Sequence, residues 1–265
     1  MKDKLAFGYP EGLTTGGTHY CPGCTHGIIH RLIAEVIDEL GVRERTVGVS
    51  PVGCAVLAYN YFSTDYQEAS HGRAPAVATG IKRARPDLMV YTYQGDGDLA
   101  SIGMAEIVHA ANRGEKFTVV FVNNAIYGMT GGQMAPTTMP GQVTSTSPRG
   151  RELDLAGHPI RMVELISTLH TPAFVARGTV IRPLQAVQTK ELLRRAFQYQ
   201  KEGKCFSMVE ILSTCPTNWG MPPAEALNWL EKTMMPYYPL GVFKTPEEGV
   251  DRAPLPLCGL QDGGK

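Results

Sequence analysis

The spacing of apolar residues predicts helices and strands in alternation. In residues 25–40 apolar side chains recur three and four positions apart, and Gly41 follows, so this segment is predicted to be a helix. Apolar runs at residues 88–94 and 117–122 are typical of strands covered on both faces. A helical pattern at residues 101–112 lies between them. Together these segments predict a strand–helix–strand unit.

The rest of the chain continues this alternation and predicts a doubly wound α/β fold with a parallel sheet. Residues 128–159 are rich in Gly, Thr, Ser and Pro and show no sustained period, so we expect a long loop of functional importance. We treat residues 1–265 as a single domain with a C-terminal tail from about residue 220. Further helices are expected at 161–168, 183–201 and 223–234, and further strands at 173–176 and 206–212.

Composition and charge restrict the class of protein. Of the 265 residues, 43% are hydrophobic and 19% are charged, which is typical of a folded soluble protein. Lys and Arg together number 25 and so do Asp and Glu, so the charge balance disfavours nucleic-acid binding. No apolar run approaches the roughly 18 residues of a membrane span, and the first residues lack a signal-peptide stretch. We therefore expect a cytoplasmic protein.

Polar residues follow two of the predicted strands. Gly95, Asp96, Gly97 and Asp98 come after the first strand, and the pair 123–124, both Asn, follows the second. Ligands of parallel sheets bind at the carboxyl ends of strands, and these oxygen donors suit a Mg²⁺ ion on a diphosphate. The helix opening at Ser101 would direct its free amides to the same place. The alternative is an ordinary turn; no dinucleotide or Walker motif is present.

These residues resemble the diphosphate-binding signature of thiamine diphosphate enzymes. The resemblance extends over about residues 18–220 and is specifically to the β subunit of 2-oxoacid:ferredoxin oxidoreductases. It is carried by five segments in order, Tyr20-Cys-Pro-Gly-Cys24, His71-Gly-Arg-Ala74, Ala78-Thr-Gly-Ile-Lys82, Gly95-Asp-Gly-Asp98 and Ile126-Tyr-Gly-Met-Thr130, followed by Pro136-Thr-Thr138. The resemblance implies the thiamine-diphosphate-binding fold.

The resemblance also implies a Mg²⁺ site. Its side-chain ligands would be Asp96 and Asn124, its third ligand the backbone carbonyl of Ile126, and Asn123 would be a structural neighbour. The contacts expected around the diphosphate are Gly95, Gly97, Asp98, Gly128 and Thr130.

The segment His71-Gly-Arg73 has two interpretations. The resemblance places this turn beside the cofactor, where His71 or Arg73 would donate to the diphosphate or to the reacting group, and His71 is the candidate catalytic residue. The alternative is a turn that leads into the Ala-rich helix and carries surface charges.

The cysteines have no unique interpretation from their spacing. Six cysteines are too few for a disulfide scaffold, and one Cys-x-x-Cys pair with scattered cysteines fits a Zn²⁺ site, a redox pair or core packing. The resemblance implies one [4Fe-4S] cluster on Cys21, Cys24, Cys54 and Cys215. Cys205 is then expected in the core and Cys258 is left over. His19 and His26 flank the pair and are expected to tune the cluster from outside its ligand set.

The resemblance implies oxidative decarboxylation of a 2-oxoacid to acyl-CoA and CO₂ with reduction of ferredoxin. The cofactors would be thiamine diphosphate, Mg²⁺ and the cluster, with coenzyme A as cosubstrate. The carboxylate that faces the aminopyrimidine would come from an α subunit, and a γ subunit and a ferredoxin-like δ subunit would complete the complex. Two alternatives are a noncatalytic Zn²⁺-binding interaction module and a nonoxidative thiamine-dependent decarboxylase.

One departure from the family bears on the substrate. Gly131 stands where relatives that take charged or very small 2-oxoacids often have a basic residue, and the apolar run 55–57 follows Cys54. We therefore expect a branched-chain 2-oxoacid such as 2-oxoisovalerate, with 2-oxoglutarate next. Alternatively, the partner subunit supplies the substrate contacts.

Overall fold

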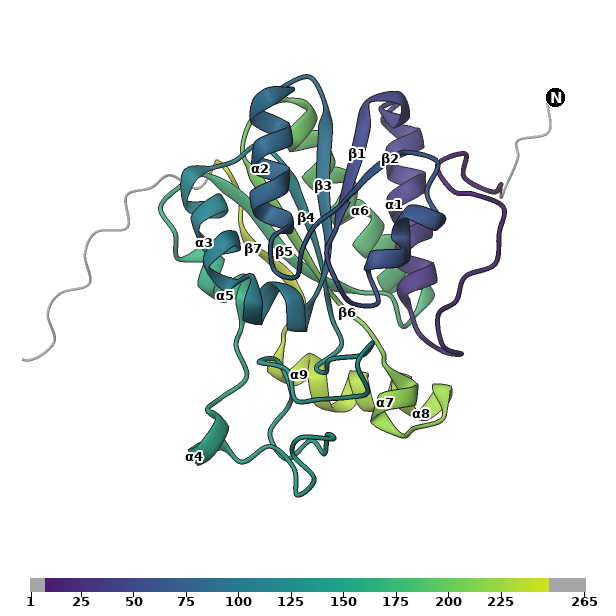
Figure 1. Ribbon diagram of the computed structural model, residues 1–265, viewed down its shortest axis with the longest axis vertical. Coiled ribbons are helices and arrows are strands. Elements are labelled where there is room, and N and C mark those ends of the chain that lie inside the picture. The colour runs from purple at the N-terminus through teal and green to yellow at the C-terminus, as the bar shows by residue number, and fades with distance from the viewer. Residues whose placement is uncertain (1–7, 248–265) are drawn as a thin grey trace, which may run out of the picture.

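A mostly parallel sheet with helices on both faces organises the chain (Figure 1). The computed structural model describes residues 8–247. Within that range the strand order is β2-β1-β3-β4-β6-β5-β7, and β7 alone runs antiparallel to its neighbour. The strands are β1 (Thr46–Ser50), β2 (Asp65–Glu68), β3 (Met89–Gly95), β4 (Thr118–Asn123), β5 (Ala173–Thr179), β6 (Phe206–Leu212) and β7 (Gly241–Lys244).

The central strands are buried because helices cover both sides of the sheet. One face packs against α1 and α6, and the other against α2, α3 and α5. This arrangement confirms the expected doubly wound α/β fold. The helices of these two layers are α1 (His26–Glu39), α2 (Ala74–Ala84), α3 (Met104–Arg113), α5 (Met162–Ser167) and α6 (Pro183–Lys201).

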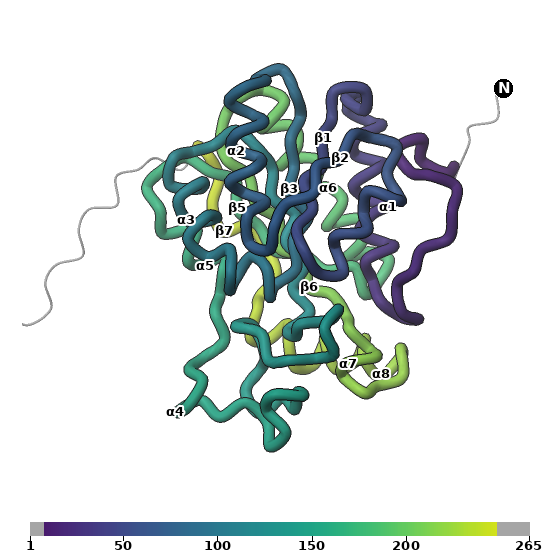
Figure 2. Tube along the Cα trace, in the orientation of Figure 1, coloured from purple at the N-terminus to yellow at the C-terminus, as the bar shows by residue number. Residues whose placement is uncertain are grey.

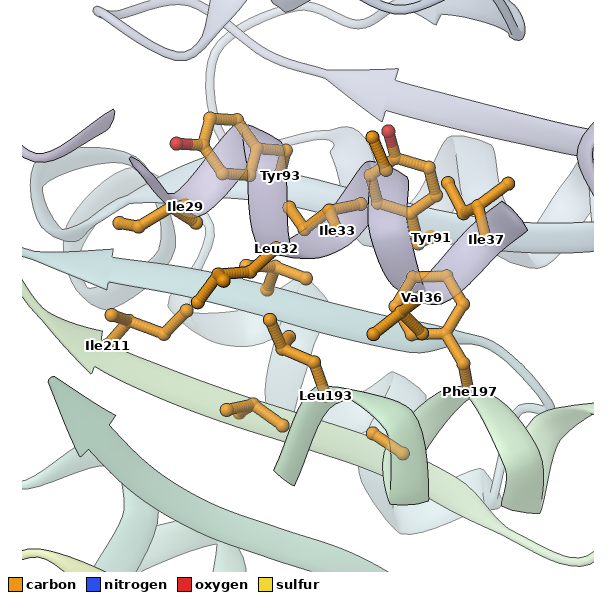
Figure 3. Close-up of a cluster of buried hydrophobic side chains, with 14 of the residues drawn as sticks. Ile29, Leu32, Ile33, Val36, Ile37, Tyr91, Tyr93, Leu193, Phe197 and Ile211 are labelled. Carbon is orange, nitrogen blue, oxygen red and sulfur yellow. The ribbon is translucent and has the colours of Figure 1, made fainter. Parts of the chain in front are cut away.

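In the helix α1, the apolar residues that recur along the sequence form one buried face. Its residues Ile29, Ile33 and Ile37 are fully buried, each four positions from the next. They pack toward Tyr91 of β3 and Phe197 of α6 (Figure 3). An amphipathic stripe of this kind is stabilised mainly by the apolar surface it removes from water.

The helices of the long loop and of the segment after β6 lie beyond the carboxyl ends of the strands. A long loop over residues 124–160 extends away from the sheet and passes beside the helices after β6 (Figure 2). Asn218 of α7 donates to the carbonyl of Gly128 at 2.8 Å, which joins the two segments. These helices are α4 (Leu153–Ala156) within the loop, then α7 (Pro216–Trp219), α8 (Pro223–Trp229), a π-helical turn η4 (Leu230–Met234) and α9 (Met235–Tyr237).

One buried arginine holds the long loop together. Arg151 is 6% exposed, and its guanidinium donates to backbone carbonyls from both sides of the loop. The acceptors are the carbonyls of Ala135, Pro136, Thr138, Ala156, Gly157 and His158, at 2.9 to 3.2 Å. The loop is therefore internally ordered although it has almost no regular secondary structure.

The structure corrects several predicted boundaries. The helix after β3 begins at Asp98 with a π-helical turn, η3 (Asp98–Ile102), so Ser101 does not open it. The predicted helix 223–234 continues through α9, and β5 is longer than predicted. The prediction omitted β1, β2 and β7, all of five residues or fewer. The last part of the predicted tail, residues 248–265, lies outside the described residues.

Candidate functional site

Asp96 lies directly after β3, and three donors hold its carboxylate. Its Oδ1 accepts the Gly97 N–H at 2.9 Å, and its Oδ2 accepts the Ile126 N–H at 3.1 Å and the Thr137 hydroxyl at 2.6 Å. The side chain is buried, and burial raises the pKa of Asp96 to about 6 although the three donors act to lower it. The three donors favour the ionised form of this carboxylate and fix its orientation.

The segment after β4 brings a second oxygen to the same pocket. Asn124 is 7% exposed, and its Oδ1 has no hydrogen-bond partner among the described residues. The next residue, Ala125, has φ +59°, a left-handed conformation that is rare and strained for a residue other than glycine. Mg²⁺ prefers hard oxygen ligands, and a buried amide oxygen without a partner, in the same pocket as a carboxylate, is such a ligand.

The predicted diphosphate contacts surround one pocket. Besides Asp96 and Asn124, it is lined by Gly95, Gly97, Asp98, Ile126, Gly128, Thr130 and His71. Apolar residues complete the wall, including Val52, Ala55 and Met129. Of the run 55–57, only Ala55 lines this pocket, and Gly131 does not. With His26, the pocket gathers residues from five separate segments of the chain.

Gly128 lines this pocket next to two of the thiols. A Cβ atom there would lie 3.7 Å from Nδ2 of Asn124, 3.2 Å from Sγ of Cys54 and 3.7 Å from Sγ of Cys215. The distance to Sγ of Cys54 is shorter than ordinary van der Waals contact, so a glycine leaves room for this thiol. Asn124, a predicted metal ligand, and two of the predicted cluster cysteines therefore border the same residue.

The four predicted cluster cysteines are brought into one region. Cys24 donates its N–H to the carbonyl of Cys21 at 3.0 Å, and Nδ2 of Asn218 donates to Sγ of Cys215 at 3.3 Å. Burial, with added repulsion from the other thiolates, raises the pKa of Cys24 to about 12 and that of Cys54 to about 11. These thiols therefore ionise readily only when a cation or cluster compensates their charge.

The other cysteines lie apart from this region. Cys205 is fully buried in the core shared with α1 and α6, as expected, and Cys258 lies outside the described residues. The cysteines of the described part are all free, without a disulfide. Within residues 8–247, no group of three or more His, Cys, Asp or Glu side chains is gathered closely enough to hold a single metal ion.

His71 and Arg73 have different environments. Nδ1 of His71 is 2.6 Å from Oδ1 of Asp98, and this oxygen also accepts the Gly72 N–H, whereas Oδ2 of Asp98 accepts from Nε2 of Gln94. Asp98 thus anchors the turn that carries His71 into the pocket. Arg73 does not line the pocket and instead forms an ion pair with Glu106 of α3. The structure therefore does not support the expected cofactor contact of Arg73 and favours the surface-charge alternative for it.

His26 and His19 lie within an aromatic cluster next to the Cys-x-x-Cys segment. His26 lines the pocket, and its Nδ1 is 2.5 Å from the hydroxyl of Tyr93. Burial lowers the pKa of His26 to about 4, so this side chain is neutral at physiological pH. Nδ1 of His19 contacts the hydroxyl of Tyr61. Neither imidazole joins the predicted metal ligands.

Comparison with known proteins identifies the family. Residues 51–211 match the family model of the C-terminal TPP-binding domain of thiamine pyrophosphate enzymes. The chain is 36% identical over 222 residues to the 2-oxoglutarate synthase subunit KorB of Methanocaldococcus jannaschii, covering 80% of this chain and 77% of that one. The chain belongs to the 2-oxoacid:ferredoxin oxidoreductase β-subunit family. This finding confirms the resemblance drawn from the motifs.

Two further relatives refine the position of this β subunit. It is 51% identical over 233 residues to the ketoisovalerate oxidoreductase subunit VorA of Methanothermobacter thermautotrophicus, covering 88% of this chain and 49% of VorA. The chain thus spans about half the length of this relative. A solved 2-oxoglutarate:ferredoxin oxidoreductase of Magnetococcus marinus, with 2-oxoglutarate, coenzyme A and succinyl-CoA bound, aligns with TM-score 0.72 and 29% identity over 87% of this chain and 75% of that one.

Sequence reasoning missed several residues of this β subunit's site. Thr137 belongs to the Pro-Thr-Thr segment that carried the resemblance, yet its bond to Asp96 was not expected. The apolar residues Val52 and Met129 belong to no sequence pattern that would have marked them as pocket residues.

No helix in the described range 8–247 combines the length and apolarity required to cross a membrane.

Proposed function

We propose that this chain is the thiamine diphosphate-binding subunit of a complex that oxidatively decarboxylates a 2-oxoacid. The 2-oxoacid and coenzyme A become acyl-CoA, CO₂ and a proton, and two ferredoxins each accept one electron. The observation that carries the proposal is that two proposed centres adjoin at Gly128. A Cβ atom at this position would lie within 4 Å of the amide of Asn124 and of the thiols of Cys54 and Cys215.

The Mg²⁺ site would use one oxygen from each of three groups. Asp96 and Asn124 would supply side-chain oxygens, and Ile126 its backbone carbonyl. The support is the orphaned Oδ1 of Asn124 together with the anchored carboxylate of Asp96. Gly95, Gly97, Gly128 and Thr130 would then surround the diphosphate, and His71 would present Nε2 to the ligand because Nδ1 is bound to Asp98.

The thiols would hold one [4Fe-4S] cluster through Cys21, Cys24, Cys54 and Cys215. When bound, thiamine diphosphate supplies the carbanion chemistry of decarboxylation, and an iron–sulfur cluster takes the electrons. What this chain contributes is their placement, because Cys54 lines the pocket that also contains Asp96. Free cysteines are typical of a reducing compartment, which favours the cytoplasm.

A partner subunit would complete the site. The carboxylates lining the pocket in the described part are Asp96 and Asp98, and both are occupied by donors of this chain. The acid that faces the aminopyrimidine would therefore come from an α subunit. We propose a γ subunit and a ferredoxin-like δ subunit as the other components, with ferredoxin as acceptor.

The substrate would be a branched-chain 2-oxoacid such as 2-oxoisovalerate, with 2-oxoglutarate as the second choice. The support is the apolar wall of Val52, Ala55 and Met129 and the 51% identity to a protein named ketoisovalerate oxidoreductase. An apolar wall favours an apolar substituent and disfavours an unpaired second carboxylate.

Anaerobic purification with the co-purifying subunits tests the proposal. We expect thiamine diphosphate, Mg²⁺, iron and sulfide in the complex, and ferredoxin reduction that requires both a 2-oxoacid and coenzyme A. Stoichiometric zinc without thiamine diphosphate would instead identify an interaction module. Release of CO₂ without ferredoxin reduction would identify a nonoxidative decarboxylase.

A further inference from the structure

A buried polar network lies behind the strained segment that carries Asn124. Glu210 of β6 is fully buried, and its two carboxylate oxygens bind different neighbours. Oε1 accepts from Nδ2 of Asn123 at 2.7 Å, and Oε2 accepts from Nε of Arg177 at 2.7 Å. The far side of the Arg177 guanidinium binds both oxygens of Glu164, at 3.0 and 2.6 Å. These residues do not line the cofactor pocket.

Asn123 connects this network to the backbone of the site. Its Oδ1 accepts the N–H of Ala125 at 3.1 Å, and Ala125 is the residue in the left-handed conformation. Side-chain to backbone bonds over two residues stabilise such turns. The turn directs Asn124 into the pocket and brings the N–H of Ile126 to Asp96.

Glu210 determines which way the Asn123 amide faces. A carboxylate accepts hydrogen bonds and does not donate, so the NH₂ group of Asn123 must face Glu210 and its oxygen must face Ala125. The hydroxyl of Tyr238 gives its single proton to the carbonyl of Thr137 at 3.0 Å, so toward Asn123 it can only accept. It therefore favours the same orientation of the amide as Glu210 does.

We propose that Glu210 is a positioning residue for the metal–diphosphate site. By fixing the Asn123 amide it holds Ala125 in its left-handed turn and thereby sets the Asn124 oxygen and the Ile126 backbone. Glu210 acts through Asn123 and does not touch the ligand. The inference rests on the proposed function, because it assigns the segment 124–126 to Mg²⁺–thiamine diphosphate.

Because donors and acceptors must match at Asn123, an isosteric substitution of Glu210 tests the proposal. In Glu210→Gln the new amide must keep its oxygen toward Arg177, which only donates, so its NH₂ group would face the NH₂ group of Asn123. The Asn123 amide must then turn over and lose its bond to Ala125. In the double variant Glu210→Gln/Asn123→Asp, the carboxylate at 123 accepts from both the new amide and the Ala125 N–H. The complementary pattern is restored without a change in total charge.

The measurement is the affinity of the purified full-length protein, with its co-purifying subunits, for thiamine diphosphate at saturating Mg²⁺ by calorimetry. We expect Glu210→Gln to weaken binding about 10–100-fold and the double variant to recover most of it. Glu164→Gln is the matched control: it alters the other end of the Arg177 network, so it should lower the melting temperature and leave the affinity unchanged.

The outcomes separate the two proposals. If the wild-type complex does not bind thiamine diphosphate, the proposed function fails and the inference fails with it. If the wild type binds and folded Glu210→Gln binds equally well, the positioning role is overturned and the proposed function stands. If Glu210→Gln does not fold, a folded double variant with nearly wild-type affinity supports the role. A double variant that is neither better folded nor better bound than the single variant overturns it.

Discussion

The hydroxyl of Thr137 donates a 2.6 Å hydrogen bond to Oδ2 of Asp96, a residue 41 positions earlier in the chain. This bond ties the long loop to the end of β3. It is a charge-assisted contact in a buried place, and such bonds are stronger than those between neutral groups. The loop thereby becomes part of the proposed metal site.

We expect Thr137→Val to weaken Mg²⁺-dependent binding of thiamine diphosphate about tenfold. Loss of the donor removes a bond worth about 1.5–3 kcal/mol and leaves Asp96 less well fixed. Calorimetry of the complex at several Mg²⁺ concentrations measures the effect. Thr137→Ser keeps the hydroxyl and should bind almost as the wild type does. Equal affinity of Thr137→Val and the wild type would show that the bond does not matter for the cofactor.

Gly128→Ala should reduce both cofactor and iron content. The added methyl group would lie 3.2 Å from Sγ of Cys54, which is closer than ordinary van der Waals contact, so it displaces a proposed cluster ligand that also lines the cofactor pocket. Iron, sulfide and thiamine diphosphate analysis of the purified complex checks this expectation. Gly80→Ala in α2 is the control, because a Cβ there meets nothing within 4 Å. Full content of both groups in Gly128→Ala would contradict the adjoining-centre proposal.

Replacing any one of Cys21, Cys24, Cys54 or Cys215 with Ser should lower cluster iron, because each would remove a thiolate ligand. Cys205→Ser should retain iron, since Cys205 lies in the apolar core away from the other thiols. Cys258→Ser is the second control. Iron per protein and the visible absorption of anaerobic samples provide the comparison. An equal loss of iron in the two controls would refute this ligand set.

The complex should use 2-oxoisovalerate with a kcat/KM at least about tenfold higher than that for 2-oxoglutarate, because the pocket wall is apolar. Steady-state kinetics with both substrates measures this ratio. Met129→Arg introduces a base at the wall and should shift the ratio toward 2-oxoglutarate, whereas Met129→Leu should leave it nearly unchanged. A wild-type preference for 2-oxoglutarate would move substrate recognition to the partner subunit.

The fold was largely predictable where the apolar pattern was long. The helix α6 (Pro183–Lys201) and the strand β6 (Phe206–Leu212) match their predicted bounds. The edge strand β2 was missed because Asp65–Glu68 is polar and mostly exposed, so it has no apolar run. Charged residues on an edge strand discourage its pairing with other chains. Because they interrupt the apolar pattern, they also prevent the strand from being predicted from the sequence.

The candidate site was predictable only in part. Asp96 and Asn124 follow neighbouring parallel strands, so their proximity follows from the topology. The bond from Thr137 could not be foreseen, because it comes from a loop without a period. The left-handed backbone of Ala125 carries no sequence signal either, since alanine seldom adopts it. Both features depend on tertiary contacts.

The hydrogen bonds from Arg151 to the loop carbonyls affect how this subunit would assemble with other subunits. Because one guanidinium binds both sides of the long loop, the loop loses its conformational freedom when the chain folds. A chain that docks against residues 128–160 therefore meets a preformed surface and need not order it. More of the contact energy then remains as affinity, and association is limited by encounter and orientation rather than by loop folding.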